Sequence, residues 1–274
     1  GALVQPADER APARRDPARP QGARRHRRER SRGVREDRRA GEDGAREKLI
    51  SSAANPRLKL VRKLQDRRWR DKLGLFAVEG EDLVQAGLDA GLEPEELLVA
   101  GENVSAEVLA TVSALPHPAR RIAVFRRGDL PRGASGVGLA LWRVGDPGNL
   151  GTILRTADAL GPAFVALSDG CADPTGPKAV RASMGAIFRV PLAGFEEAPG
   201  RRVALGARGG EPLREVELGD AVTFVLGAER EGLPDEVAAA CDARASIELA
   251  AGAESLNVAV AAALALYELR RRQG

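Results

Sequence analysis

The longest uninterrupted apolar segment of the chain lies close to its C-terminal end. Nine consecutive apolar residues run from Val258 to Leu266, and alanine and leucine, which have high helix propensities, dominate the segment. The pattern predicts a helix over residues 256–272 that is apolar on nearly every side and is therefore buried. The run is well short of the roughly 18 apolar residues that a membrane span needs, so we expect no membrane insertion.

Two polar residues open this predicted helix. Ser255 and Asn257 lie where the first N–H groups of a helix have no partner within the helix. Their side chains can cap the helix, or the helix start can hold a polar ligand. The local sequence leaves both interpretations open.

The second half of the chain alternates apolar strand-like runs with helical patterns. The predicted strands are residues 137–144, 163–167, 203–207, 222–226 and 245–249, and the predicted helices are residues 150–160, 177–185, 234–240 and 256–272. Such alternation is typical of an α/β domain with a parallel sheet. Ligands of parallel sheets bind beyond the carboxyl ends of the strands, so the loops after Val144, Leu167, Leu226 and Leu249 are candidate sites.

The first half predicts a smaller α/β domain over residues 48–127. Asn55-Pro56 signals the start of a basic amphipathic helix over residues 57–72, in which Trp69 can pack in a core or stack on a base. Strands at 75–80, 97–99 and 122–125 alternate with helices at 81–90 and 105–114. A segment rich in glycine, residues 128–136, predicts a linker to a second domain over residues 137–274. The Arg- and Pro-rich residues 1–47 lack apolar periodicity and are expected to be disordered.

Positive charge is concentrated in the first quarter of the chain. Residues 1–48 hold fifteen Lys and Arg against nine Asp and Glu, and residues 57–72 hold eight against two, whereas the remainder is net acidic. This asymmetry predicts that a polyanion is engaged near the N-terminal end, although residues 1–48 taken alone can equally be a solvated tail.

Composition excludes several classes of chemistry. Two isolated cysteines and two histidines predict neither a metal cluster nor a disulfide framework. No apolar segment follows the N-terminal charges as a signal peptide requires, so we expect a cytoplasmic protein.

Two loops and one helix of the second half carry candidate chemistry. Gly145-Asp146-Pro147-Gly148-Asn149-Leu150-Gly151, followed by Arg155, matches neither a dinucleotide fingerprint nor a P-loop. In the loop after Leu226, Gly227 and Gly232 can let the backbone approach a ligand beside Glu229, or can simply form a strand-turn-helix connection. Lys178 and Arg181 lie three residues apart on one helical face, a spacing that suits phosphate contacts.

Together and in this order, these elements resemble the SpoU (TrmH-like) family of RNA ribose 2′-O-methyltransferases, which belongs to the SPOUT class. The similarity covers about residues 137–272 and involves three motifs and one further segment. These are Asp146–Gly151 with Arg155, Leu226–Glu229 with Gly232-Leu233, Ser255–Ala259, and the segment Arg181–Gly185. Residues 49–127 are similar to the small L30e-like substrate-binding domain that precedes many members.

The resemblance implies a fold, a cofactor and partners. It implies a deep trefoil knot in the C-terminal part of the α/β domain, S-adenosylmethionine as cofactor, RNA as substrate, and a homodimer with the site near its interface. The cofactor-binding residues that it implies are Leu226, Gly227, Gly232, Ile247, Leu249 and Leu256. The catalytic constellation that it implies is Asn149, Arg155, Glu229, Ser255 and Asn257. We expect RNA contacts from the basic helix and the Lys178 helix, at Arg57, Arg62, Lys63, Arg67, Arg68, Lys178, Arg181 and Ser183.

A ribose 2′-hydroxyl becomes a good nucleophile only as its proton is withdrawn. Arg155 is the candidate for handling this hydroxyl and the adjacent phosphate, across the dimer or within one chain, either as a base or only by positioning and polarising.

One residue departs from the family pattern, because Glu248 follows Ile247 where a proline is usual. The resemblance implies a methyltransferase without a metal, and its two-domain layout favours ribosomal over transfer RNA as the substrate. A non-catalytic RNA-binding factor on the same fold is the alternative.

Overall fold

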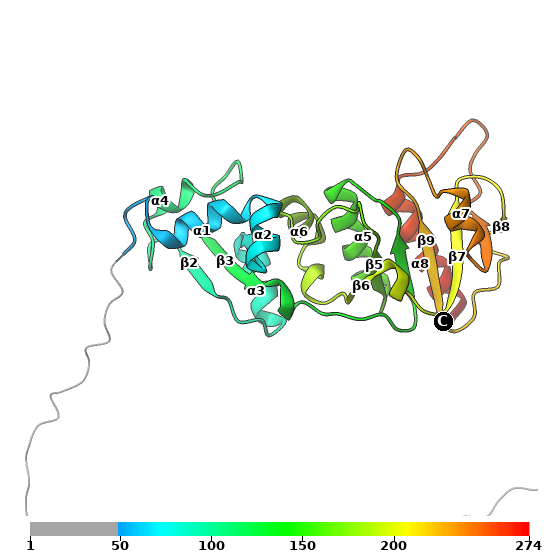
Figure 1. Cartoon of the computed structure of the whole chain (residues 1–274), viewed down its shortest axis with the longest axis horizontal. Coiled ribbons are helices and arrows are strands. Elements are labelled where there is room, and N and C mark those ends of the chain that lie inside the picture. The colour runs from blue at the N-terminus through cyan, green and yellow to red at the C-terminus, as the bar shows by residue number, and fades with distance from the viewer. Residues whose placement is uncertain (1–48, 274) are drawn as a thin grey trace, which may run out of the picture. The chain divides into compact units, whose positions relative to one another are not determined.

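The computed structural model describes residues 49–273 (Figure 1). The tail predicted to be disordered, residues 1–47, lies outside the described residues. Within the described part, no helix is long and apolar enough to cross a membrane.

The small domain is built on a three-stranded antiparallel sheet in the order β1-β3-β2. Its strands are β1 (Leu75–Glu79), β2 (Glu96–Val99) and β3 (Arg121–Arg126). Its helices are α1 (Pro56–Leu64), α2 (Arg67–Leu73), α3 (Glu81–Asp89) and α4 (Ala106–Ala110). These elements follow the predicted order of helices and strands.

The prediction of a single basic helix over residues 57–72 is wrong, because the structure has two helices there. Asn55 caps α1, its side-chain oxygen accepting the N–H of Arg57 at 2.9 Å. Asp66 caps α2 in the same way, accepting the N–H of Arg68 at 2.9 Å. A second N-cap in the middle of the pattern starts a new helix, since the capping carboxylate satisfies N–H groups that a continuous helix would bond internally.

The large domain contains a seven-stranded sheet in the order β6-β5-β4-β9-β7-β10-β8, and every neighbouring pair is parallel. The predicted parallel sheet is therefore confirmed. The strands are β4 (Gly138–Leu141), β5 (Phe164–Leu167), β6 (Leu192–Gly194), β7 (Arg201–Gly206), β8 (Glu211–Pro212), β9 (Val222–Leu226) and β10 (Ala243–Ser246).

Strand β10 is shorter than predicted. The apolar pattern extends it to Leu249, but the strand ends at Ser246, which pairs with Gly206 and Pro212. Those two residues are the last of the neighbouring strands, so the chain beyond Ser246 has no strand to pair with. Ile247 and Leu249 consequently belong to a loop. Strands β6 and β8 were not predicted, since two or three residues are too few to show a pattern.

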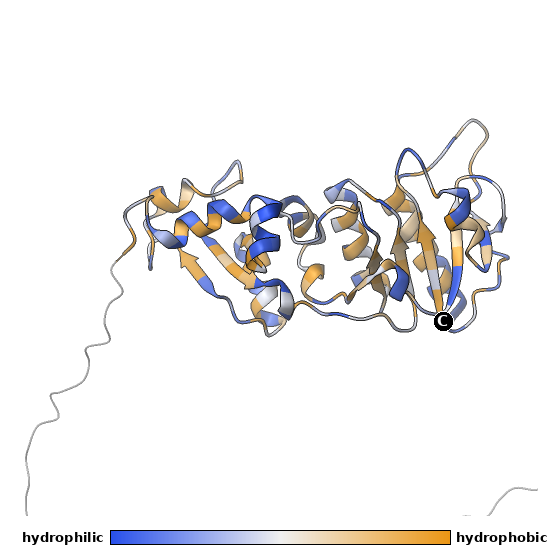
Figure 2. Ribbon diagram, in the orientation of Figure 1, coloured by the Kyte–Doolittle hydropathy of each residue, from blue (hydrophilic) through white to orange (hydrophobic). Residues whose placement is uncertain are grey.

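The helices of the large domain are α5 (Pro147–Leu160), α6 (Pro177–Ser183), α7 (Asp235–Ala239) and α8 (Val258–Gln273). Short 3₁₀ turns lie at η1 (Arg127–Asp129), η2 (Ala186–Phe188) and η3 (Phe195–Glu197). Hydrophobic residues follow the strands and the inner faces of the helices that cover them (Figure 2).

Helix α8 is less completely buried than its sequence predicts. One side packs into the core through residues that include Ala262, Ala265 and Leu266. On the other side Val260, Leu264 and Tyr267 keep 47%, 38% and 58% of their surface exposed. The helix therefore presents an apolar stripe to solvent.

The order of strands creates a switch point in the sheet. On one side of β4 the sheet continues outward with β5 and then β6. The later strands β7 to β10 all lie on the opposite side of β4 within the sheet, and β9 is the one directly beside it. Connections leave in opposite directions at such a point and open a crevice at the carboxyl ends of the two strands. The trefoil knot stays a prediction, because strand order does not define a knot.

Candidate active site at the carboxyl edge of the parallel sheet

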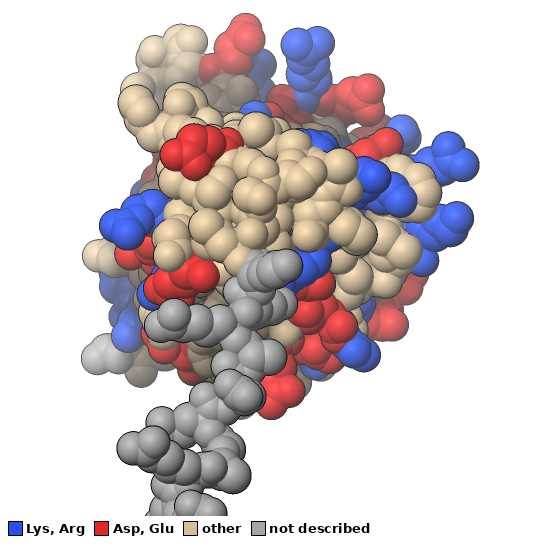
Figure 3. All heavy atoms as spheres, turned by 90° about the vertical axis from the view of Figure 1, so that its left-hand side faces the viewer, with Lys and Arg blue, Asp and Glu red and all other residues tan. Residues whose placement is uncertain are grey.

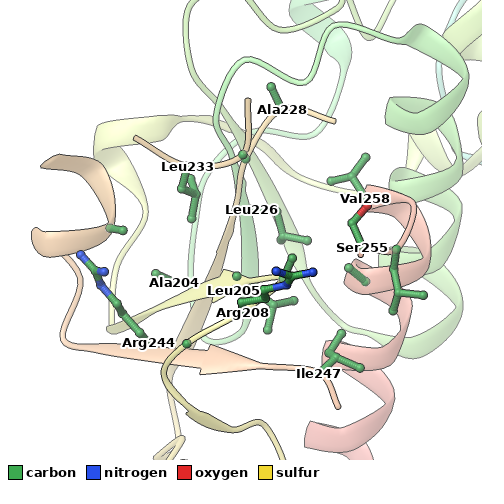
Figure 4. A pocket seen from close by; sticks show the side chains of 18 of the residues that line it. Ala204, Leu205, Arg208, Leu226, Ala228, Leu233, Arg244, Ile247, Ser255 and Val258 are labelled. Carbon is green, nitrogen blue, oxygen red and sulfur yellow. The ribbon is translucent and has the colours of Figure 1, made fainter. Parts of the chain in front are cut away.

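A cavity of about 430 Å³ lies beyond the carboxyl ends of β7, β9 and β10, against the start of α8 (Figure 4). Its lining includes the apolar side chains of Leu226, Ile247 and Val258, with Arg208 reaching into the space between Leu226 and Ile247. The cavity is thus assembled from segments that are far apart in the sequence but share one edge of the sheet.

The structure brings all six expected cofactor-binding residues to this cavity. They are Leu226, Gly227, Gly232, Ile247, Leu249 and Leu256. Their role in binding stays a prediction.

Two of these residues have a clear structural reason to be glycine. A Cβ added to Gly227 would lie 2.1 Å from the carbonyl carbon of Gly232. Gly232 has a φ of +68° and donates its N–H to the carbonyl of Ala228 at 2.9 Å. The loop after β9 therefore closes tightly on itself, and this closure holds Glu229 at the rim of the cavity.

A chain of side-chain hydrogen bonds joins three motif residues. Asn257 donates through Nδ2 to Oδ1 of Asn149 at 3.0 Å, and Asn149 donates through Nδ2 to Oε1 of Glu229 at 2.7 Å. The Oδ1 atom of Asn257 accepts the N–H groups of Ala259 at 2.9 Å and Val260 at 3.4 Å. Because the backbone donors fix the oxygen of Asn257, its amide nitrogen must face Asn149, which fixes the orientation of the second amide in turn.

Asn257 is therefore both a helix cap and a member of a polar cluster. The cap and ligand interpretations of the helix start do not exclude each other. Ser255, the second polar residue of this segment, lines the cavity beside Leu256.

A second hollow, of about 460 Å³, adjoins the cavity at the switch point between β4 and β9. Arg143, Asp146 and Asn149 line one side, and the second hollow shares Glu229 and Arg230 with the first cavity. Glu229 therefore stands between the two spaces. Two reacting molecules can approach each other across such a boundary.

Asp146 fixes the start of α5 and so the position of Asn149. Its carboxylate accepts the N–H of Asn149 at 2.9 Å and pairs with the Lys178 ammonium at 2.8 Å. The hydrogen bond from Lys178, together with those from the backbone, lowers the pKa of Asp146 below its ordinary value. The charged cap starts α5 three residues earlier than the sequence predicts.

Arg155 is the catalytic candidate that the structure does not bring to the site of its own chain. It lies on the exposed side of α5 and lines neither hollow. Its side chain forms no hydrogen bond or ion pair with other residues in the described range 49–273, which leaves its guanidinium group available.

Several expected RNA-binding residues form hydrogen bonds or ion pairs with other residues of the small domain. Arg57 pairs with Glu96, and Arg62 bonds the carbonyl of Ala53 and the hydroxyl of Thr111. Arg67 lies 3.6 Å from Asp71 on the surface. Arg57 is the least available of these residues, because its side chain is also half-buried.

Two further cations contact the half-buried Trp69. The Lys63 ammonium lies 4.6 Å and the Lys72 ammonium 5.2 Å from the centre of its ring. Arg68 is exposed, and in the described part of the chain its side chain has no hydrogen-bond or ion-pair partner. Charges of both signs surround a largely uncharged centre on the end of the molecule seen in Figure 3. Among the described residues visible in that view, Lys and Arg are interspersed with Asp and Glu.

Helix α6 carries the other expected RNA contacts. Lys178 is engaged with Asp146, and Arg181 is partly exposed. Ser183 is fully buried and donates its hydroxyl to the carbonyl of Val180 at 2.8 Å. The expectation that Ser183 contacts RNA is corrected, because the residue has no solvent-exposed surface.

The sequence interpretation missed one loop of the cavity. Residues 204–209, at the end of β7 and beyond it, line the cavity and include Arg208. The glycines at 206, 209 and 210 were a usable signal, since two of them have φ near +80° and make a tight turn directly after a strand.

Glu248, which departs from the family pattern, is exposed and pairs with Arg214. It does not line the cavity, whereas its neighbours Ile247 and Leu249 do. The substitution therefore leaves the apolar wall in place.

Fold and site together define an α/β domain with a cavity of small-molecule size at the carboxyl edge of its parallel sheet. Residues 136–267 match the SpoU rRNA methylase family, and residues 55–124 match the MRM3-like substrate-binding domain. The chain is 31% identical over 244 residues to the 23S rRNA (guanosine(2553)-2′-O)-methyltransferase RlmP of Bacillus subtilis strain 168, covering 81% of this chain and 98% of that protein. This chain belongs to the SpoU family of RNA methyltransferases.

Solved structures agree with this assignment. The AdoMet-bound rRNA methyltransferase from Sinorhizobium meliloti superimposes with a TM-score of 0.73 at 32% identity, covering 82% of this chain and 98% of that one. The SpoU methyltransferase AviRb from Streptomyces viridochromogenes, in complex with AdoMet, gives a TM-score of 0.70 at 25% identity over 80% and 98% of the two chains.

Proposed function

We propose that this protein transfers a methyl group from S-adenosylmethionine to a ribose 2′-hydroxyl of ribosomal RNA. The observation that carries the proposal is the position of Glu229, which borders both hollows and is hydrogen-bonded to Asn149. The B. subtilis relative, named for methylation of 23S rRNA, supports ribosomal rather than transfer RNA as the substrate. We also propose that the protein acts in the cytoplasm.

The first cavity fits the cofactor by size and by chemistry. A volume of about 430 Å³ lies within the range of small-molecule sites. Leu226, Ile247 and Leu256 offer apolar surface for a purine ring, and the carboxylate of Glu229 suits a ligand with a positive centre. The cofactor supplies a methyl group that is already activated for transfer.

The residues of the polar cluster then have distinct tasks. Glu229 accepts the hydrogen bond of the ribose hydroxyl and draws its proton away as attack begins. Asn149 holds the Glu229 carboxylate in place, and Asn257 holds Asn149. Ser255 contributes a hydroxyl at the cofactor side of the boundary.

We assign Arg155 to the site of a second copy of the chain in a homodimer. Helices α5 and α8 run side by side, because Asn149 bonds Asn257 at their starts and Arg270 bonds the carbonyl of Gly161 near their ends at 3.3 Å. Arg155 is exposed on α5, next to the helix that carries the apolar stripe of Val260, Leu264 and Tyr267. A second copy that covers this stripe receives Arg155 near its own site, where the guanidinium holds the RNA phosphate.

The proposed activity is tested with purified protein and a 23S rRNA transcript free of protein. Calorimetry is expected to show binding of S-adenosylmethionine, and transfer of a radioactive methyl group is expected to protect one phosphodiester bond from alkaline hydrolysis. Cofactor binding without transfer to any RNA would instead support a non-catalytic factor. Transfer to tRNA but not to rRNA would overturn the substrate assignment.

The shared site is tested by mixing two inactive variants, Arg155→Ala and Asn257→Ala. If Arg155 acts across the interface, each mixed dimer has one site in which both residues are intact. Free exchange of subunits then restores about a quarter of the wild-type activity. If Arg155 acts within its own chain, every mixed dimer stays inactive.

A further inference from the structure

A buried ion-pair cluster joins α2 of the small domain to the loop before α6 of the large domain. Arg70 is only 4% exposed, and its Nε donates to Oδ2 of Asp173 at 2.8 Å across 103 residues of sequence. Its Nη1 donates to the carbonyls of Leu64 and Gln65, each at 2.9 Å. The guanidinium group thus connects the end of α1 with the large domain.

Asp173 is satisfied on both of its oxygens. Besides Arg70, it accepts the N–H of Thr175 at 2.9 Å, the Thr175 hydroxyl at 2.7 Å and Nη2 of Arg127 at 3.3 Å. Arg127 also pairs with Asp71, next to Arg70 on α2. Burial raises the pKa of Asp173, but the hydrogen bonds from Thr175 and Arg70 and the charge of Arg127 outweigh it, so the pKa lies below its ordinary value. The carboxyl group is therefore charged at neutral pH.

Close packing supports the ion pairs. Phe76 and Phe125 of the small domain meet Phe188 of η2, with ring centres 6.3 and 5.5 Å apart. A Cβ added to Gly185 would lie 2.8 Å from Cβ of Ala86 in α3, and one added to Gly87 would lie 3.2 Å from the Phe188 ring. A charged pair in such surroundings adds little net stability but fixes one geometry, since a shifted interface leaves charges buried without partners.

The loop that Arg70 holds continues directly into the site. Five residues after Asp173, Lys178 pairs with Asp146, and Asp146 caps the helix that carries Asn149. The basic residues of α1 and α2 are thus connected to the polar cluster through packed and hydrogen-bonded elements.

We propose that Arg70 is a positioning residue that locks α1 and α2 to the large domain, so that the span between docked RNA and the cofactor cavity selects the nucleotide to be methylated. This inference rests on the proposed function. It assigns Arg70 a task different from that of its neighbours on α2, because a side chain with 4% exposure does not contact RNA. Lysine cannot replace it fully, since the planar guanidinium serves Asp173 and two carbonyls at once.

Two matched substitutions on α2 test the proposal. Arg70→Met removes the buried guanidinium and keeps much of its apolar length, whereas Arg68→Met removes an exposed guanidinium two residues away. Three quantities are compared with the wild type: the calorimetric affinity for S-adenosylmethionine, the kinetics and position of methyl transfer to a 23S rRNA transcript, and amide hydrogen exchange over residues 127–136 and 173–177.

Arg68→Met is expected to raise KM for the transcript while leaving the methylated nucleotide and the exchange rates unchanged. Arg70→Met is expected to keep its cofactor affinity, to speed exchange in both segments on the order of tenfold or more, and to spread methylation over neighbouring nucleotides with a lower kcat. Arg70→Lys is expected to recover part of the positional accuracy. A purely structural loss would instead lower cofactor affinity together with activity.

Unchanged exchange and a single wild-type methylation site in Arg70→Met would overturn the proposal. If Arg70→Met does not fold, Asp173→Asn provides the same test, because it keeps the shape and the Thr175 acceptor but removes the charge. If the wild type methylates no RNA, the proposed function fails, while the exchange measurement still decides whether Arg70 locks the two domains.

Discussion

Replacing Asn257 separates the two tasks that the structure gives this residue. Its Oδ1 caps α8, and its Nδ2 holds Asn149, which holds Glu229. Asn257→Ala removes both interactions. Asn257→Asp keeps an acceptor for the helix N–H groups but replaces the donor to Asn149 with a second acceptor.

The loss of stability in each variant follows from the interactions that the substitution removes. Loss of an asparagine N-cap costs about 1 kcal/mol, and loss of a solvent-exposed neutral hydrogen bond costs roughly 0.5 kcal/mol more. For a folded unit of this size, about 1.5 kcal/mol corresponds to a fall in Tm of roughly 3–6 °C. Asn257→Asp restores the cap, and its negative charge at a helix start returns about 0.3–1 kcal/mol.

Thermal unfolding and methyl transfer are measured on both variants. We expect Asn257→Ala to lose stability and activity, and Asn257→Asp to regain stability while its kcat stays on the order of 100-fold below the wild type, as for other misplaced catalytic groups. Cofactor affinity serves as the control, because the apolar wall of the cavity is intact in both. Recovery of full activity in Asn257→Asp would show that Asn257 is only a cap and would refute its role in the site.

Three further outcomes follow from the contacts. Gly227→Ala forces a Cβ against the Gly232 backbone, so calorimetry is expected to show loss of cofactor binding; retained affinity would contradict the tight closure of the loop. Leu264→Arg places a charge in the apolar stripe of α8 and is expected to give a monomer by light scattering, with activity lost but the fold kept; a dimeric variant would place the interface elsewhere. Hydrogen bonds from Arg271 and Arg272 lower the pKa of Glu268 to about 2, so its stabilising effect is present above its ordinary pKa near 4.5 and is lost as the pH falls towards 2. The stability difference between wild type and Glu268→Gln, roughly 0.5 kcal/mol for a surface helical pair, is expected in full at pH 6 and reduced near pH 2, where Glu268 is partly protonated; an equal difference at both pH values would contradict this assignment.

Local patterns predicted most of the helices and strands. Asn55 and Pro56 mark a helix start because a cap and an N1 proline are local devices, and β9 matches its predicted range because all five of its residues, four of them apolar, are buried. The prediction from local patterns was wrong at Asp66, because the apolar periodicity continues past this residue although it caps a second helix. It also failed beyond Ser246, since the end of a strand depends on partners elsewhere in the chain.

The sequence predicted those site residues that belong to the motifs and act through polar side chains. Glu229, Asn149 and Asn257 were expected to act together, and the structure brings them into one hydrogen-bonded chain. The loop that carries Arg208 was missed because residues 204–209 belong to none of the motifs that the sequence interpretation used, although its glycines mark a turn after a strand. The pairing of Arg70 with Asp173 spans 103 residues, and no local pattern predicts which of several arginines on α2 turns inward.

The most direct test is mass-spectrometric mapping of a 23S rRNA transcript after incubation with the purified protein and S-adenosylmethionine. Our account predicts one added methyl group on the ribose of a single nucleotide, abolished by Asn149→Ala and by Glu229→Gln. A methyl group on a base, or ribose methylation that persists in both variants, would contradict the proposed site and its chemistry.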